Sequence, residues 1–141
     1  MFKLQVITLS GVFKDEEVFE VRVPTTAGTI AINADNAPLV GAIKPGILTV
    51  VHKRGEVDSQ NQIVGVYSGT VEVLNNVVKV LVDEVDALED VSQAEAEKAL
   101  AHAKELSEKA GDSVALAEAH SMIDRSAVRL RLAGLRKHSK H

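Results

Sequence analysis

The apolar residues of this chain change their spacing near Asp90, and this change constrains the fold more than any other feature. Before it, Val and Ile alternate with polar residues, which is the period of half-buried β-strands. After it, apolar residues recur every three or four positions, which is the period of an amphipathic helix. We therefore predict a β domain over residues 1–90 and a helical domain over residues 91–141.

Short apolar runs separated by turn signals fill the first of these domains. Pro45-Gly46 is a strong turn dipeptide, and Asn75-Asn76 has the spacing of a tight hairpin turn. No helical pattern separates the runs, and parallel neighbours would need crossovers of about a dozen residues or more. The pattern predicts an antiparallel β-sandwich or barrel, with strands at residues 2–6, 21–23, 30–32, 47–51, 63–67, 71–74 and 77–82.

The helical domain has recognisable helix starts. Ser92 and Glu95 have the spacing of a capping box, in which the serine accepts a hydrogen bond from an amide of the first turn. A glycine ends this helix, and Asp112 or Ser113 can cap the next. Helices joined by so short a turn lie antiparallel, so residues 91–137 are predicted to form a two-helix hairpin. Its apolar stripes are mostly alanine, which buries little area, and we expect weak hydrophobic stabilisation.

Composition excludes several functional classes. The chain has no cysteine, which excludes a disulfide framework, a thiolate zinc site and a cysteine nucleophile. Three Phe, one Tyr and no Trp offer little surface for stacking nucleic-acid bases. The net charge of −4 is too mild to indicate a nucleic-acid binder. No apolar run approaches the ~18 residues of a membrane span, and the first residues do not read as a secretory signal.

Catalytic and metal-binding motifs are also missing from the sequence. It contains no Gly-rich phosphate loop, no nucleophile elbow and no His-Glu-x-x-His pattern. His102 and Glu105 are three residues apart on a predicted helix, but two ligands do not make a metal site. We therefore expect a chain that is not an enzyme and that needs no metal or other cofactor.

Basic residues gather late in the second predicted helix. In one interpretation they are solvated cations that complement the helix macrodipole, which suits Arg131 and its followers better than Arg125. In the other they contact an acidic partner. Spacing alone favours the first interpretation. A stand-alone binder of an anionic surface or nucleic acid, acting through this helix, is the alternative function that the residues leave open. The arginines concerned are Arg125, Arg129, Arg131 and Arg136.

Three segments carry a more specific signal than their periodicity. They read Val-Pro-Thr-Thr-Ala-Gly-Thr-Ile at 23–30, Ala-Asp-Asn-Ala-Pro-Leu at 34–39 and Ala-Ile-Lys-Pro-Gly-Ile-Leu at 42–48. In residues and spacing they strongly resemble the ε subunit of bacterial and chloroplast F-type ATP synthases. Residues 67–73 and 80–85 resemble two later strands of the same family, so the resemblance covers nearly the whole chain.

The resemblance implies a non-catalytic subunit of a rotary central stalk. In this family the β domain binds the γ subunit and rests on the c-ring, and so couples ion flow to the catalytic head of α and β subunits. The helical hairpin permits turnover when folded and hinders ATP hydrolysis when extended along γ. The implied location is peripheral, in the F1 sector on the cytoplasmic face of a bacterial plasma membrane. The coupling ion, H+ or Na+, stays open.

Family roles carry over to two groups of residues. The first is the loop that contacts the c-ring and γ: Asp35, Asn36, Ala37 and Pro38. Here Asn36 stands where the family usually has His, and Asp35 where it often has Gly. The second group corresponds to basic residues that face an acidic segment of the catalytic β subunit, which strengthens the partner interpretation. It comprises Arg125, Arg129, Arg131 and Arg136.

A nucleotide site known from some bacterial members is degenerate in this chain. Those members bind ATP through an Ile-Asp-x-x-Arg-Ala motif at the start of the first helix. Here Ser92 replaces the Asp and Glu95 replaces the Arg, while Ala96 is kept. A carboxylate repels phosphate where a guanidinium would pair with it. Arg125 and Arg129 resemble the arginines that assist in those members, but we expect weak or no ATP binding.

Overall fold

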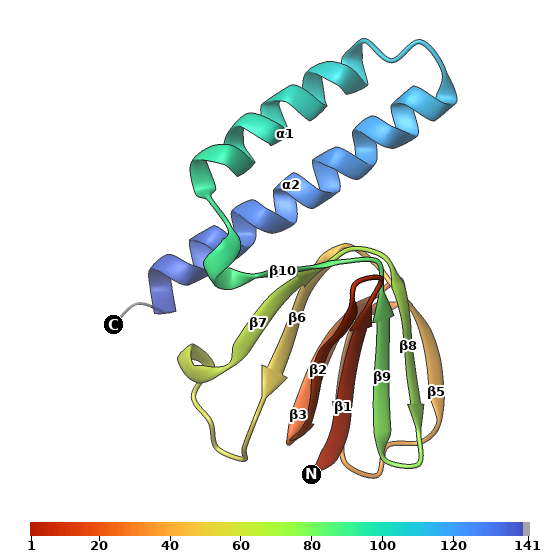
Figure 1. Cartoon of the computed structure of the whole chain (residues 1–141), viewed down its shortest axis with the longest axis vertical. Helices are drawn as coiled ribbons and strands as arrows, with labels where there is room; N and C mark the ends of the chain where they lie inside the picture. Colours follow the sequence, from red (N-terminus) through yellow and green to blue (C-terminus); the bar gives the residue numbers. More distant parts are fainter. Residues whose placement is uncertain (140–141) are drawn as a thin grey trace. The chain divides into compact units, whose positions relative to one another are not determined.

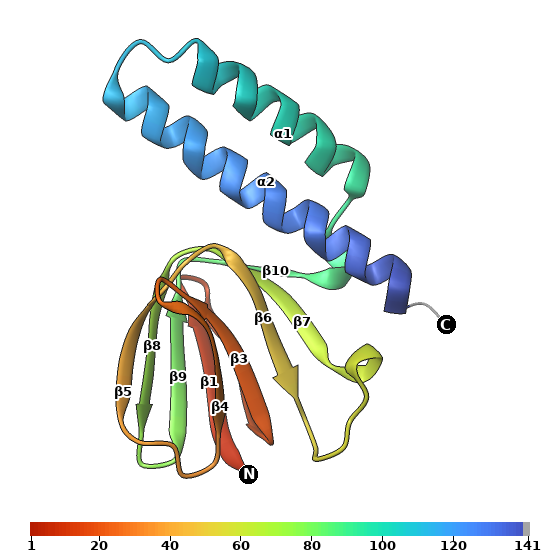
Figure 2. The same cartoon turned by 180° about the vertical axis from the view of Figure 1, so that it is seen from behind.

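The computed structural model describes residues 1–139, and side chains as far as residue 135. The chain divides into two compact units, Met1–Ala87 and Leu88–His141 (Figures 1 and 2). The first unit is built of strands and the second of helices, and the boundary lies close to the predicted change of pattern at Asp90.

The first unit is a ten-stranded sheet that curls on itself into a sandwich (Figure 1). The strand order is β10-β7-β6-β3-β5-β8-β9-β1-β2, with β4 paired to β3. A short 3-10 helix, Asp58–Gln60, precedes β7. The strands are β1 (Phe2–Thr8), β2 (Gly11–Val18), β3 (Glu20–Thr25), β4 (Gly28–Asn33), β5 (Leu39–Ile43), β6 (Gly46–Val51), β7 (Gln62–Val66), β8 (Gly69–Leu74), β9 (Val77–Val82) and β10 (Val85–Ala87).

The antiparallel sandwich predicted from the sequence is confirmed, with one exception in its pairing. Among the described strands only β1 and β9 run parallel, with Lys3 opposite Val77 and Ile7 opposite Leu81. The crossover requirement did not exclude this pair, because it applies to a direct connection between parallel neighbours. Here the rest of the sheet connects the two strands. The parallel pair places the start of the chain beside the β8–β9 hairpin.

Alternation of apolar and polar residues places the core of this unit between its layers. Phe2, Leu4 and Val6 of β1 are buried, while Lys3 between them is exposed. The same period buries one side of the other strands, so that the core consists almost entirely of Val, Leu and Ile. Its fully buried members include Val18, Val21, Val23, Ile32, Leu48, Val50, Val66, Val71 and Val80.

The second unit contains two antiparallel helices, α1 (Gln93–Glu108) and α2 (Ser113–Ser139), as predicted (Figure 2). A short 3-10 helix, Leu88–Asp90, precedes them. The Ser92 hydroxyl accepts a hydrogen bond from the Glu95 amide at 3.3 Å, which confirms the predicted cap of α1. Of the two candidates for the second cap, Asp112 fills the role, because its Oδ1 accepts from the Ala115 amide at 2.7 Å.

We predict that Gly69→Ala destabilises the β unit. A Cβ at this position would lie 2.8 Å from the Cα of Val82 and 2.9 Å from the carbonyl carbon of Leu81, so the backbone of β9 would have to move. The expected loss is ~1–3 kcal/mol in the free energy of unfolding. Urea titration followed by fluorescence of Tyr67, the single tyrosine and a buried residue of this unit, measures it in a chain without Trp.

Gly41→Ala is the matched control, because the nearest atom to a Cβ there is the Val71 Cγ1 at 3.4 Å, an ordinary contact. We expect the control to change stability by less than about 1 kcal/mol. Equal unfolding midpoints for the two variants would contradict the close approach of β8 and β9.

Candidate functional site

The predicted contact loop connects β4 to β5 at one end of the β unit (Figure 2). All of its residues, Asp35 to Pro38, are exposed. Asp35 adopts φ +61°, a left-handed conformation that Asp and Asn tolerate better than most residues. The Asn36 Oδ1 accepts a hydrogen bond from the Asn33 amide at 3.0 Å. The loop is therefore a defined turn, and Asn36 uses its side chain to stabilise it.

A second turn, between β8 and β9, contacts this loop. Asn76 accepts a hydrogen bond from the Asp35 amide through its Oδ1, at 2.9 Å. Its Nδ2 donates to the Met1 carbonyl oxygen at 3.1 Å. The sequence identified residues 75 and 76 only as a turn. Their contact with the loop depends on how the strands pair, which periodicity does not show.

Exposed apolar side chains flank the loop. Val40 of β5 is 74% exposed, and Leu74 of β8 is also exposed. The two strands are paired through Leu39 and Val73, so both side chains lie near the same end of the unit. We call Met1, the loop Asp35–Pro38, Val40 and Leu74 the loop-end surface. An exposed turn beside apolar side chains is typical of a docking surface.

A second apolar surface lies toward the other end of β1. Leu9 is 88% exposed and Val12 is 66% exposed. Ile7 of β1 pairs with Val12 of β2 and with Leu81 of β9, so these residues form a strip across three strands. We call Leu9, Val12 and Leu81 the outer strip. The sequence analysis missed it, because single exposed apolar residues carry no signal until pairing brings them together.

The predicted arginines do not share one environment. Arg125 and Arg129, one turn apart on α2, are half-buried, whereas Arg131 is exposed. The side chain of Arg136 lies outside the described residues. The structure therefore brings two of the predicted residues onto one face and leaves Arg131 on another.

The residues of the degenerate nucleotide motif lie at the start of α1. Ser92 caps the helix through its hydroxyl, and Ala96 is buried. Glu95, which stands where ATP-binding relatives have Arg, is exposed. Ser92 and Ala96 thus have local structural roles at the start of α1.

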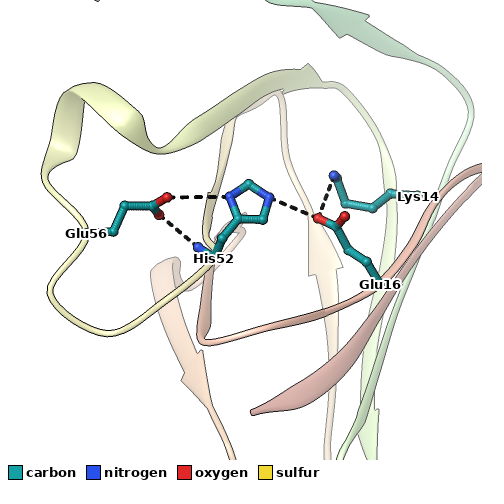
Figure 3. A network of polar contacts seen from close by, with 4 residues as sticks. All are labelled: Lys14, Glu16, His52 and Glu56. Carbon is teal, nitrogen blue, oxygen red and sulfur yellow. Dashed lines mark hydrogen bonds and ion pairs between the residues drawn. The ribbon is translucent and has the colours of Figure 1, made fainter.

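A polar cluster among the described residues joins β2 to the segment after β6 (Figure 3). Glu16 Oε1 accepts from the Lys14 Nζ at 2.8 Å and lies 3.0 Å from the His52 Nε2. On the other side of the imidazole, Glu56 accepts from the His52 amide at 2.8 Å, and its second oxygen lies 3.6 Å from the Nδ1. Sequence analysis did not predict this cluster, because β2 and the segment after β6 are far apart in the chain.

The pKa of Glu16 reflects the charged groups around it in this cluster. Burial would raise the pKa of its carboxyl group, but the hydrogen bond and charge of Lys14, with those of His52, hold the pKa below the ordinary value of 4.5. Within the described part of the chain, no three His, Cys, Asp or Glu side chains are placed to hold a metal ion. None of the described helices has the length and apolar character needed to cross a membrane.

Lys14→Met should raise the pKa of Glu16 toward 4.5, because it removes the main favourable partner of the carboxylate. NMR titration of the Glu16 side-chain carboxyl carbon measures this change directly. The interactions that lower this pKa stabilise the fold above pH 4.5. Their contribution is lost as the pH falls below that value and the carboxylate is protonated. The effect on stability should be only a fraction of ~1 kcal/mol, because the carboxylate is 38% exposed. An unchanged titration curve would contradict the ion pair.

Comparison with known proteins gives a consistent set of similarities. Residues 1–87 match the family model "ATP synthase, Delta/Epsilon chain, beta-sandwich domain". An ATP synthase epsilon chain of Chloroflexus aggregans is 32% identical over 134 residues, which cover 95% of this chain and 93% of the relative. The chloroplastic ATP synthase epsilon chain of Oltmannsiellopsis viridis is 32% identical over 129 residues, 92% of this chain and 95% of the relative.

Solved structures show the same fold. A chain in the cryo-EM structure of the Euglena gracilis mitochondrial ATP synthase, described as OSCP/F1/c-ring, aligns with a TM-score of 0.78. The alignment covers 94% of this chain and 79% of that chain at 22% identity. A chain in the central stalk and c-ring structure of the Tetrahymena thermophila mitochondrial ATP synthase aligns with a TM-score of 0.62 at 16% identity, covering 98% and 96%.

Proposed function

This chain belongs to the delta/epsilon family of ATP synthase subunits, as an epsilon subunit, and we propose that it couples the rotor to the catalytic head and restrains ATP hydrolysis through its helical hairpin. The resemblance of the sequence segments to this family is confirmed. The family accounts for both units of the chain, so a stand-alone binder of an anionic surface or nucleic acid is not needed to explain it.

We assign the coupling role to the β unit. The loop-end surface and the outer strip lie toward opposite ends of β1, so one unit can contact two partners at once. We propose that the loop Asp35–Pro38 contacts the c-ring and the adjoining γ subunit, and that the outer strip adds to the γ contact. The relatives' structures contain an F1 sector and a c-ring in one assembly, which supports these partners.

The proposed role requires no chemistry from this chain. As a peripheral subunit of the F1 sector it transmits movement between subunits, while the catalytic head forms and hydrolyses ATP. We further propose that it lies on the cytoplasmic face of a bacterial plasma membrane. The epsilon chain of Chloroflexus aggregans, similar over nearly its whole length, supports a bacterial setting.

The regulatory role is supported chiefly by the packing of the hairpin. Its buried positions include Ala96 and Ala103 of α1 and Ala119 of α2. An alanine contributes a single methyl group, about 0.8 kcal/mol when buried, against ~1.5–3 kcal/mol for a larger apolar side chain. Val128 and Leu132 of α2 are also buried, but the many alanines make separation of the helices less costly than it would be in a pair packed by large side chains throughout. An extended form then needs less compensation from new contacts. With 27 residues, α2 spans roughly 40 Å at ~1.5 Å per residue, long enough to reach a distant subunit.

Deleting residues 91–141 tests this division of roles. We expect the remaining 1–90 chain to stay folded, to assemble with γ and the c-ring, and to support ATP synthesis. The ATPase rate of the assembled complex should rise, because the restraining element is gone. Loss of assembly by a chain whose β unit is shown to be folded would contradict the assignment of coupling to this unit. An unchanged ATPase rate would contradict the regulatory role.

Replacing Arg125 and Arg129 together by Ala tests the contact with an acidic segment of the β subunit. These two arginines share one face of α2, and the double variant should raise the ATPase rate by about twofold or more, the factor expected for one or two exposed charge pairs. The restraint in the parent should also weaken at high salt, since the Debye length falls from ~10 Å at 0.1 M to ~3 Å at 1 M. Arg131→Ala removes a positive charge from another face of α2, so it is the control for the loss of charge alone.

Two outcomes distinguish an electrostatic restraint of ATP hydrolysis from a steric one. If deletion of the hairpin activates the enzyme but the double variant does not, the restraint is steric and these arginines are incidental. If Arg131→Ala activates as strongly as the double variant, net charge matters and the shared face does not. Since the side chain of Arg136 lies outside the described residues, its contribution is tested by a separate Arg136→Ala variant.

We expect the isolated chain not to bind ATP at micromolar concentration. Ser92 is occupied as a helix cap, and the Glu95 carboxylate would repel the phosphates. Titration calorimetry is the measurement, with the Ser92→Asp, Glu95→Arg double variant as the comparison, because Asp also caps helices. Micromolar or tighter binding by the parent chain, roughly −8 kcal/mol, would show that Arg125 and Arg129 suffice or that the site is built differently.

A further inference from the structure

We infer that Asn76, in the turn between β8 and β9, is the positioning residue for the loop Asp35–Pro38. This inference rests on the proposed role of that loop as the contact with the c-ring. The side chain of Asn76 makes two hydrogen bonds, one to the loop and one to the start of β1. It thereby joins three segments that are far apart in the sequence.

Asn76 is bonded through the oxygen and the nitrogen of its side-chain amide. The Oδ1 accepts from the Asp35 amide at 2.9 Å, and the Nδ2 donates to the Met1 carbonyl oxygen at 3.1 Å. The main chain adds a third bond, from the Lys3 amide to the Asn76 carbonyl oxygen at 3.2 Å. These bonds fix the orientation of the side-chain amide. They thereby hold the loop in place beside the β8–β9 turn.

The loop needs this support because its own bonds are few. Asp35 adopts φ +61°, a conformation that costs free energy for a residue with a Cβ. Within the loop, the Asn36 side chain accepts from the Asn33 amide, and Pro38 has no amide hydrogen to donate. Among the described contacts, the hydrogen bond from the Asp35 amide to Asn76 links the loop to the β8–β9 hairpin. A docking loop held in its bound shape loses less conformational entropy on binding.

The neighbouring residue provides a matched control. Asn75 and Asn76 both have positive φ, +51° and +63°, as a tight hairpin turn requires. Glycine adopts such angles without strain, so Asn75→Gly and Asn76→Gly both preserve the turn. Only the second variant removes the side-chain bonds to Asp35 and Met1. A difference between the two therefore reports the tether and not the turn.

The first measurement is amide hydrogen exchange of the isolated full-length chain. In Asn76→Gly the Asp35 amide should exchange about fivefold faster or more, the factor that corresponds to the net worth of one hydrogen bond. In Asn75→Gly it should keep the parent rate. The unfolding midpoint of Asn76→Gly should lie slightly below that of Asn75→Gly, because the side-chain bonds that are lost also stabilise the folded chain. Equal Asp35 exchange rates in the two variants would overturn the inference.

The second measurement places the loop in the assembled ATP synthase. The chain has no cysteine, so Ala37→Cys introduces its single thiol at the exposed loop. A benzophenone maleimide on this thiol should crosslink to a c subunit on illumination. The yield should fall about threefold or more when Asn76→Gly is added, and should not change with Asn75→Gly.

The outcomes distinguish the inference from the function on which it rests. Crosslinking by the parent that is equally strong in both glycine variants overturns the positioning role and leaves the c-ring contact standing. A parent chain that assembles but gives no crosslink to a c subunit overturns the proposed loop contact itself. A reduced yield confined to Asn76→Gly, together with faster Asp35 exchange, supports both.

Discussion

The parallel pairing of β1 with β9 is the constraint on which the β unit depends. It joins the first strand of the chain to the last hairpin of the sheet, and so connects β2 to β8 and β5 through one continuous ladder. It also determines what lies at each end of the unit. The start of β1 comes to the β8–β9 turn, where Asn76 binds Met1, and the end of β1 brings Ile7 beside Leu81. The outer strip and the place of Met1 in the loop-end surface follow from this one register.

The two units differ in how they are held together, and the difference matches their proposed roles. The β unit buries branched side chains across several strands, and a core of this kind resists local opening. Where the helical unit buries small residues such as Ala103 and Ala119, each contact contributes little. A part that transmits movement must keep its shape, whereas a part that switches must have two arrangements of similar free energy. The different side chains buried in the two units fit these two proposed roles.

Features set by local spacing could be predicted from the sequence, and features set by strand register could not. The Ser92 cap, the helical hairpin and the Asn75-Asn76 turn each depend on residues a few positions apart, and all three are present. The parallel pair, the Asn76 tether and the cluster around His52 join residues dozens of positions apart. Periodicity states which face of a strand is buried, but it does not state which strand lies beside it. The family resemblance predicted that the loop Asp35–Pro38 is a contact, and only the structure showed what holds this loop in place.

The environment of the arginines bears on how the hairpin would switch. Arg125 and Arg129 are already half-buried in the folded chain, so contact with an acidic partner would not take them from free solution. It would exchange one partly buried environment for another, and much of the desolvation cost of a new ion pair is then already met. The net gain from such an exchange is small, as it is for most partly exposed charge pairs. A small gain suits a switch, because an element held too strongly in either arrangement would stop responding to the state of the motor.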